Sequence, residues 1–410
     1  MAPLAGLAFV TDAVLHWASM DTHLAAMSAA AKVQNWSAAL DAYETVDTAS
    51  NVSIASLPTG DTVTAAYWRE TDPAHNFVRS ALLAQGPFAG WDDTSRRELM
   101  SKGAAYQIVR QNVISRLALG IEQCTAFSGV SGVYEWEAAW ALFAGSLEGV
   151  DGSGKGESVY ALGDKRCPQF GTCVGATSIA RNNQLALEAW QDGIQALASS
   201  DCFAAELARK AIMPQLLVPF IQGTLREAYE VDPEGGAALA DGVVEFAEGW
   251  AFLAAILPRL ALCNTTTTAF IRDNMAITGA PSTTTFQPGN YRLVKAHLES
   301  LYQCLGITCQ DIGGMLTSSG AQIAGMEPCD DSARLACQVE LGSSGQATGV
   351  ANQGSGVSAE MVVLAVTCLL TLCTFVVVVA SIAIRRRGAQ KQASSKHEVA
   401  DATLVGATTA

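Results

Sequence analysis

One stretch of this 410-residue sequence, residues 361–384, contains no charged side chain and is followed directly by three arginines at 385–387. A helix rises about 1.5 Å per residue, so this stretch spans roughly 36 Å, enough to cross a hydrocarbon layer of about 30 Å. We therefore predict one transmembrane helix at residues 361–384. Because arginines beside a span stay in the cytosol, residues 385–410 form a cytosolic tail. This predicts a single-pass type I protein of the plasma membrane or an endomembrane.

The chain before this span is acidic and long enough to bury a core. The whole sequence carries a formal net charge of -14, which argues against nucleic acid as a partner. A chain of this length forms one large domain or two ordinary ones. The amino end has no basic region ahead of an apolar run, so no signal peptide is recognisable, and we expect that the given start is truncated.

Cysteines predict disulfides, because the ectodomain is expected outside the cytosol. Pairs that are close in sequence are typical of short loop staples: Cys167 with Cys173, Cys304 with Cys309, and Cys329 with Cys337. The nine cysteines before the span are Cys124, Cys167, Cys173, Cys202, Cys263, Cys304, Cys309, Cys329 and Cys337. An odd number leaves one thiol free, paired between chains or without its original partner. Three sequons, at Asn35, Asn51 and Asn264, also favour a secreted glycoprotein.

Hydrophobic periodicity predicts an all-α ectodomain. Residues 3–46 follow a helical pattern, whereas residues 47–94 are rich in Thr, Ser, Gly, Pro and Asp and are expected to be loops. Further helices are expected after residue 92, including residues 133–148 and 243–257. Residues 316–360 are rich in Gly, Ser and Gln and predict a flexible stalk that holds the ectodomain off the membrane.

The helices at 133–148 and 243–257 resemble each other. When Trp140 is aligned with Trp250, Glu135 falls opposite Glu245. We interpret this as a degenerate duplication that makes a first helical unit of residues 1–200 and a second of residues 201–315. Chance similarity between two alanine-rich helices is the alternative.

Acidic side chains within these apolar helices are the candidate metal ligands. A buried carboxylate is costly unless it is paired or binds a cation, and carboxylates that face each other across a helical bundle suit hard ions. Glu245 and Glu248 share one helix face, and Glu137 and Glu148, three turns apart, share another. The candidates are Glu135, Glu137, Glu148, Glu245 and Glu248. In the alternative, these glutamates are solvated or form salt bridges with arginines such as Arg226.

Catalytic motifs are missing from the sequence. Residues 149–155, Gly-Val-Asp-Gly-Ser-Gly-Lys, match the start of a phosphate-binding loop, but glycine follows where serine or threonine should hold magnesium. No strand pattern precedes this segment, so we expect a loop. Because no hydrolase motif is present either, we expect that the protein is not an enzyme.

Four segments resemble the algal Fe-assimilation proteins, a family that includes the low-iron-inducible periplasmic proteins and phytotransferrins. They read Trp-Glu-Ala-Ala-Trp-Ala-Leu-Phe-Ala-Gly-Ser-Leu-Glu-Gly at 136–149, Tyr-Ala-Leu-Gly-Asp-Lys-Arg-Cys-Pro-Gln-Phe-Gly-Thr-Cys at 160–173, Gln-Gly-Thr-Leu-Arg-Glu-Ala-Tyr at 222–229 and Ala-Glu-Gly-Trp-Ala-Phe at 247–252. The resemblance covers about residues 20–314. It implies a helical extracellular protein that captures ferric iron with carbonate for high-affinity uptake.

Other residues complete the expected site. Tyr134 or Tyr160 is a candidate phenolate ligand, and Arg181 and Arg272 are candidate partners of the anion, because a guanidinium fork matches a planar oxyanion. The captured iron would pass to a ferric reductase, a permease or an endocytic partner. The rival hypothesis is a metal-free adhesion or receptor ectodomain in which the glutamates form structural salt bridges.

Overall fold

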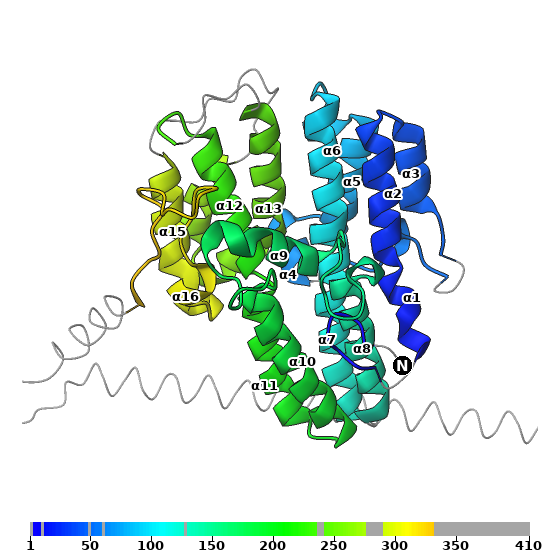
Figure 1. Ribbon diagram of the computed structural model, residues 1–410. Coiled ribbons are helices and arrows are strands. Elements are labelled where there is room, and N and C mark those ends of the chain that lie inside the picture. The colour runs from blue at the N-terminus through cyan, green and yellow to red at the C-terminus, as the bar shows by residue number, and fades with distance from the viewer. Residues whose placement is uncertain are drawn as a thin grey trace, which may run out of the picture. The chain divides into compact units, whose positions relative to one another are not determined.

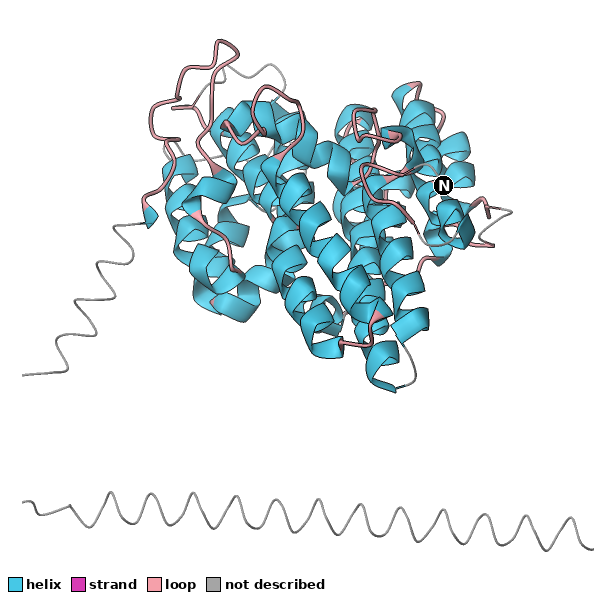
Figure 2. Ribbon diagram, turned by 60° about the horizontal axis from the view of Figure 1, so that its bottom comes forward, coloured by secondary structure: helices cyan, strands magenta, loops and turns pink. Residues whose placement is uncertain are grey.

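The computed structural model describes residues 3–9, 12–47, 51–59, 62–126, 129–235, 242–275 and 290–331. Within these ranges the chain forms helices and isolated β-bridges but no strand, as Figure 2 shows. The all-α prediction is therefore confirmed for this part of the chain. Residues Met1–Cys337 form one compact unit. The predicted membrane helix at 361–384 and the tail at 385–410 lie outside the described residues.

The first quarter of the chain builds a layer of neighbouring helices, blue to cyan in Figure 1. Its helices are α1 (Leu15–Ala18), α2 (Met20–Lys32), α3 (Trp36–Glu44), α4 (Thr62–Trp68), α5 (Pro73–Leu83) and α6 (Asp93–Lys102). A π-helical segment, η4 (Gly103–Val109), continues α6. The Asp92 carboxylate accepts hydrogen bonds from the N–H groups of Thr94 and Ser95 and so begins α6.

Residues 47–94 are less irregular than their composition predicts, because α4 and α5 lie within them. Asp72 and Pro73 begin α5, and Ala84 ends it in the left-handed conformation. Residues that favour turns also favour helix ends, so the prediction of a loop-dominated segment was wrong over α4 and α5.

Tryptophans fill the centre of the middle bundle, whose helices are α7 (Arg110–Ala126), α8 (Gly129–Ala144), α10 (Arg181–Ala198) and α11 (Cys202–Gln215). Trp136 on α8 is fully buried, and its indole N–H donates to the carbonyl of Leu117 at 3.0 Å. A side chain at Gly193 would lie 1.9 Å from the Trp136 ring, so glycine there lets α10 approach α8. Trp140 is also fully buried.

The last helices surround α13 (Gly242–Cys263), which packs against α6 as well as against its own neighbours (Figure 1). These neighbours are α12 (Val218–Val231), α14 (Thr265–Met275) and α15 (Asn290–Leu305), and α16 (Cys309–Ile312) packs against α12. Among the described residues, one segment, Val243–Cys263, is long and apolar enough to cross a membrane, and 67% of its most apolar window is buried inside the protein. Because α13 lies in the core of the protein, burial accounts for its apolar sequence.

The two look-alike helices correspond to α8 and α13, and each packs against the helix that precedes it, α7 and α12. The expected boundary at residues 200 and 201 falls in the turn between α10 and α11, which also pack together. The division into two duplicated units stays a prediction.

Among the described residues there are four disulfides. Cys167 pairs with Cys173, as predicted from their spacing. The other two predicted pairs were wrong, because Cys304 bonds to Cys263 and Cys309 bonds to Cys329. The fourth disulfide joins Cys124 on α7 to Cys202 on α11. The ninth cysteine, at position 337, lies outside the described residues.

Residues 316–331, predicted as the start of a stalk, belong to the folded body. The N–H of Leu316 donates to the carbonyl of Gln169 at 2.7 Å, and the N–H of Met315 donates to the carbonyl of Met326 at 2.9 Å. Met326 is buried. The buried Met326 side chain and the Cys309–Cys329 disulfide hold this segment against the helices despite its polar composition. The remainder of the predicted stalk lies outside the described residues.

Candidate metal-binding cavity

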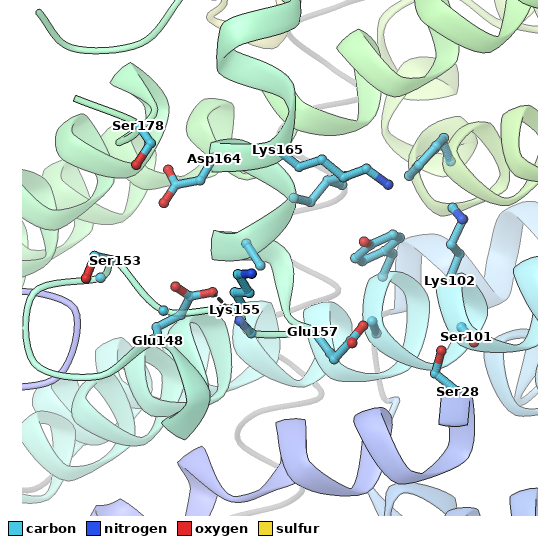
Figure 3. A pocket seen from close by; sticks show the side chains of 18 of the residues that line it. Ser28, Ser101, Lys102, Glu148, Ser153, Lys155, Glu157, Asp164, Lys165 and Ser178 are labelled. Atoms are coloured by element: carbon cyan, nitrogen blue, oxygen red, sulfur yellow. Dashed lines mark hydrogen bonds between the residues drawn. The ribbon is translucent and has the colours of Figure 1, made fainter. Parts of the chain in front are cut away.

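A cavity of about 560 Å³ lies between helices that are far apart in the sequence. Helices α2, α6 and α13, the segment η4, the loop after α8 and the helix α9 (Val159–Phe170) all contribute to its walls. Figure 3 shows the side chains that line it. The ionisable groups are four carboxylates, three lysines and one phenol: Glu98, Glu148, Glu157, Asp164, Lys102, Lys155, Lys165 and Tyr106.

Glu148 reaches this cavity because α8 ends four residues earlier, at Ala144. Gly145 has φ of +82°, a left-handed conformation that favours glycine and stops the helix. The two residues after Gly145 contact Asp21. Its carboxylate accepts hydrogen bonds from the Ser146 hydroxyl at 2.8 Å and from the Leu147 N–H at 2.7 Å. Glu148 therefore lies outside the helix, and the prediction that it shares a helix face with Glu137 was wrong.

Glu148 and Asp164 line the cavity and are stabilised mainly by amide groups. One Glu148 oxygen accepts from the N–H of Gly156 at 2.8 Å, and Asp164 accepts from Ala180 N–H at 2.7 Å and from the Asn183 side chain at 2.8 Å. Among the described residues, neither carboxylate forms a salt bridge with lysine or arginine. Burial, together with nearby Asp164, raises the pKa of Glu148 to about 7, and burial raises that of Asp164 to about 6.

Tyr160 lies close enough to this carboxylate pair to feel both charges. It is buried, and a side chain at Gly152 would lie 2.2 Å from its hydroxyl oxygen. Burial, with the negative charges of Asp164 and Glu148, raises the pKa of the Tyr160 phenol. The structure therefore brings two predicted residues, Glu148 and Tyr160, into one neighbourhood, and Tyr160 there favours the neutral phenol.

The glycine-rich loop at residues 149–156 is a wall of the cavity and lacks a phosphate cradle. Its N–H groups at 153–156 all donate hydrogen bonds to residues 147–151. In a phosphate-binding loop such groups point at the ligand. The prediction of a loop without phosphate-loop geometry is confirmed, and glycine at position 156 leaves room for the carboxylate of Glu148, which lies 2.5 Å from where a side chain would begin.

The other end of the cavity is formed by Lys102 and its partners. The ammonium of Lys102 contacts the carboxylates of Glu98 and of Glu248, the latter at 3.2 Å. Although burial opposes the charge, these two carboxylates raise the pKa of Lys102. Beside it, burial raises the pKa of Tyr106 to about 12. Glu248 therefore forms an ion pair with Lys102 that joins α13 to α6.

A second carboxylate cluster, formed by Glu227, Glu230 and Glu245, lies between α12 and α13. Their oxygens lie within 4.8 Å of one another. Glu227 is fully buried and is bound by Arg166 at 3.0 Å and by Arg226 at 2.7 Å. A cation could bind there only in competition with two guanidinium groups, so this cluster is a weaker metal candidate than the cavity.

The carboxyl groups of Glu227 and Glu245 can lie close together because one of them carries a proton. Arg166 holds the pKa of Glu227 below its ordinary value despite burial, whereas burial and a hydrogen bond to Glu227 raise the pKa of Glu245 to about 9. Glu245 is therefore protonated at neutral pH and donates its hydroxyl to Glu227.

The remaining predicted residues lie away from the cavity. Glu135 binds Arg116 at 2.6 Å, and the Arg116 guanidinium lies over the Trp17 ring at 3.7 Å. Tyr134 accepts a hydrogen bond from the Trp17 indole at 3.3 Å. Glu137 is fully buried within α8.

The two arginines predicted to bind an anion have acidic partners of their own. Arg181 lies 3.6 Å from Asp311, and Arg272 lies 2.7 Å from Asp273. Neither lines the cavity. The structure therefore separates them from Glu148 and Asp164.

Sequence reasoning missed several residues of these sites. Asp164 and Lys165 lie within the segment 160–173 used for the family resemblance, so that motif contained a usable signal. Lys102 and Tyr106 lie in an ordinary amphipathic pattern and carry no such signal. No protein family, curated protein or solved structure matches this chain. The chemistry of the cavity therefore rests on its own residues.

Proposed function

We propose that this protein captures ferric iron outside the cytosol, together with a small anion such as carbonate, in the cavity formed by α2, α6, α9 and α13. One observation carries the proposal: two largely buried carboxylates, Glu148 and Asp164, line the same cavity and have no basic partner among the described residues. Buried carboxylates without a counter-charge gain most from a multivalent cation. The other glutamates predicted as ligands have partners of their own or lie away from the cavity.

The chemistry of the cavity suits a hard ion. Carboxylate oxygens are preferred by hard, highly charged cations, and the cavity offers no sulfur or imidazole ligand among its described residues. Lysines at positions 155 and 165 can compensate an accompanying anion. The four disulfides favour an oxidising compartment, as expected of an ectodomain held at a membrane by residues 361–384.

Metal titration of the purified full-length protein tests this proposal. Iron is added as a ferrous salt and oxidised by air, with and without bicarbonate, and the iron retained after desalting is measured by mass spectrometry. The wild-type protein should retain iron, and the double variant Glu148→Gln with Asp164→Asn should lose most of it, about 100-fold in affinity if each ligand contributes about tenfold. Glu188→Gln, an exposed carboxylate on α10, is the matched control and should bind as the wild type does.

The rival function, a metal-free receptor or adhesion ectodomain, also has support. The salt bridges of Glu135 with Arg116, Glu248 with Lys102 and Glu227 with Arg166 are those expected of glutamates with structural roles. Wild-type protein that is folded, by circular dichroism, but retains no iron under either condition would favour this rival and overturn iron capture.

A further inference from the structure

The cavity is large for a single ion with carbonate. Its volume of about 560 Å³ falls within the range of about 300–1,000 Å³ that is typical of sites for small organic molecules. One water molecule occupies about 30 Å³ of liquid, so an iron ion and one carbonate would leave most of this space to solvent. The size of the cavity favours a larger anion.

Two lysines in the cavity are available to such an anion. Lys155 and Lys165 form no salt bridge or side-chain hydrogen bond with the other described residues, and both are exposed toward solvent. Lys102 differs from them, because it is buried between Glu98 and Glu248. Figure 3 shows Lys155 beside Glu148, and the Lys165 side chain extending in the direction of Lys102. The two ammonium groups therefore lie apart, one on the side of Glu148 and the other toward the end of the cavity formed by Lys102.

We propose that the anion which accompanies iron in this cavity is a small organic acid with two or three carboxylates, so that iron is bound as its complex with that acid. This inference rests on the proposed iron-capture function and names the form of its substrate. Glu148 and Asp164 supply ligands to the metal, and the ammonium groups of Lys155 and Lys165 bind the carboxylates of the acid. Lysine suits this role because its ammonium is a compact charge on a flexible stem and follows an anion of variable shape.

The charges of the cavity agree with this pairing of ligands. Glu148 and Asp164 offer two carboxylates to the metal, and the ammonium groups of Lys155 and Lys165, set apart in the cavity, suit an acid whose carboxylates are also apart. Carbonate, with only three oxygen atoms, would use one of these lysines while it bridges to the metal. An acid with several carboxylates can use both.

Double labelling tests the inference. Purified full-length protein is loaded with radioactive iron and carbon-14 citrate in one sample, and with radioactive iron and bicarbonate in another, then desalted and counted for both isotopes. The wild type should retain citrate together with iron in equal amounts. The double variant Lys155→Gln with Lys165→Gln should bind citrate about 100-fold more weakly, since a charge-assisted hydrogen bond contributes about tenfold each. Lys210→Gln, whose side chain is 66% exposed on α11, is the matched control and should retain citrate as the wild type does.

The outcomes distinguish the two proposals. Iron retained with bicarbonate but stripped from the protein by citrate would overturn the organic-acid inference and leave iron capture standing. Citrate retention that is the same in the lysine double variant and in the wild type would also overturn the inference. No iron retained with either anion would overturn both proposals.

Discussion

Glu227 and Glu245 are chemically identical side chains that the structure gives opposite protonation states. Glu227→Gln should therefore destabilise the protein by about 3–5 kcal/mol, because it leaves the fully buried Arg166 without its counter-charge. Glu245→Gln keeps a hydrogen-bond donor for Glu227 and should be tolerated. Urea unfolding of both variants at pH 7 measures the difference, and equal losses would contradict the assigned protonation states.

Stability should also depend on pH through Glu245. Its folded pKa of about 9 lies above its unfolded value of 4.5, so the native protein holds a proton that the unfolded chain loses between these values. The contribution of Glu245 to stability is therefore complete below pH 4.5 and is lost as pH rises toward 9. Comparison of urea unfolding at pH 5.5 and pH 8.5 should show a smaller loss of stability in Glu245→Gln than in the wild type.

Iron binding should weaken in acid because of Glu148 and Asp164. A carboxyl must lose its proton to bind a metal, and the pKa values of about 7 and about 6 place this competition near neutrality. Affinity should fall about tenfold per pH unit just below pH 7 and more steeply below pH 6. Titrations at constant citrate from pH 8 to pH 5 check this, and a flat profile would exclude both groups as ligands.

At the level of single residues, the sequence predicted which side chains were candidates but gave little information on their partners. Glu148 and Glu135 look equivalent in the sequence. Glu135 is neutralised by Arg116, 19 positions away on the neighbouring helix, and Glu148 is neutralised by no base among the described residues. Salt-bridge partners across helices depend on tertiary packing, which periodicity does not encode.

Among the structural elements, the turn after α8 decides where Glu148 points. Gly145→Ala should reduce stability more than Gly149→Ala, although both glycines have positive φ. A side chain at Gly145 would lie 2.5 Å from the Asp21 carboxylate, whereas nothing lies within 4 Å of one at Gly149. Left-handed strain alone costs about 1–2 kcal/mol, and the overlap with Asp21 adds to it only at position 145.

The measurement is urea unfolding of the two alanine variants, with iron affinity as a second readout. Gly145→Ala should also weaken iron binding, since it displaces the turn that carries Glu148. Equal effects of the two substitutions on both quantities would contradict this role of the turn.

Helices with strong periodicity were predictable, including α8 and α13, whereas element ends were less so. Serine, threonine, proline and aspartate around α4 and α5 are typical of loops, although Asp72 and Pro73 stand at the start of α5. Because of the glycine at 145, α8 ends at Ala144, four residues before its predicted end at 148. Composition does not distinguish a capped helix end from a loop.

For the whole molecule, the disulfides should differ in their contribution to stability. The Cys124–Cys202 bond closes a loop with a sequence separation of 78, and Cys167–Cys173 one of 6. In the chain-entropy model these loops correspond to about 4.5 and about 2 kcal/mol. Replacing each pair with alanine should therefore lower the melting temperature more for the longer loop, as measured by circular dichroism. A larger loss for the short loop would show that local strain or packing decides instead.

The cavity is a property of the whole helical body, because its walls come from segments that are far apart in sequence. Lys102, which lines the cavity, forms an ion pair with Glu248 of a distant helix, and no local pattern relates the two residues. The wrong disulfide pairs have the same cause, since Cys263 and Cys304 are brought together by the packing of α13 to α15. All-α class and individual helices were accessible from sequence, whereas long-range pairing was not.

The Cys309–Cys329 bond also determines how this body would respond to mechanical load. A pull applied to the chain beyond residue 331 reaches Cys329 first and passes through the covalent bond to Cys309 at the start of α16. The intervening residues, including buried Met326, are bypassed by the tension. With the bond intact, the helices would resist extension together. With the bond reduced, residues 310–328 would be extended before the helices unfold.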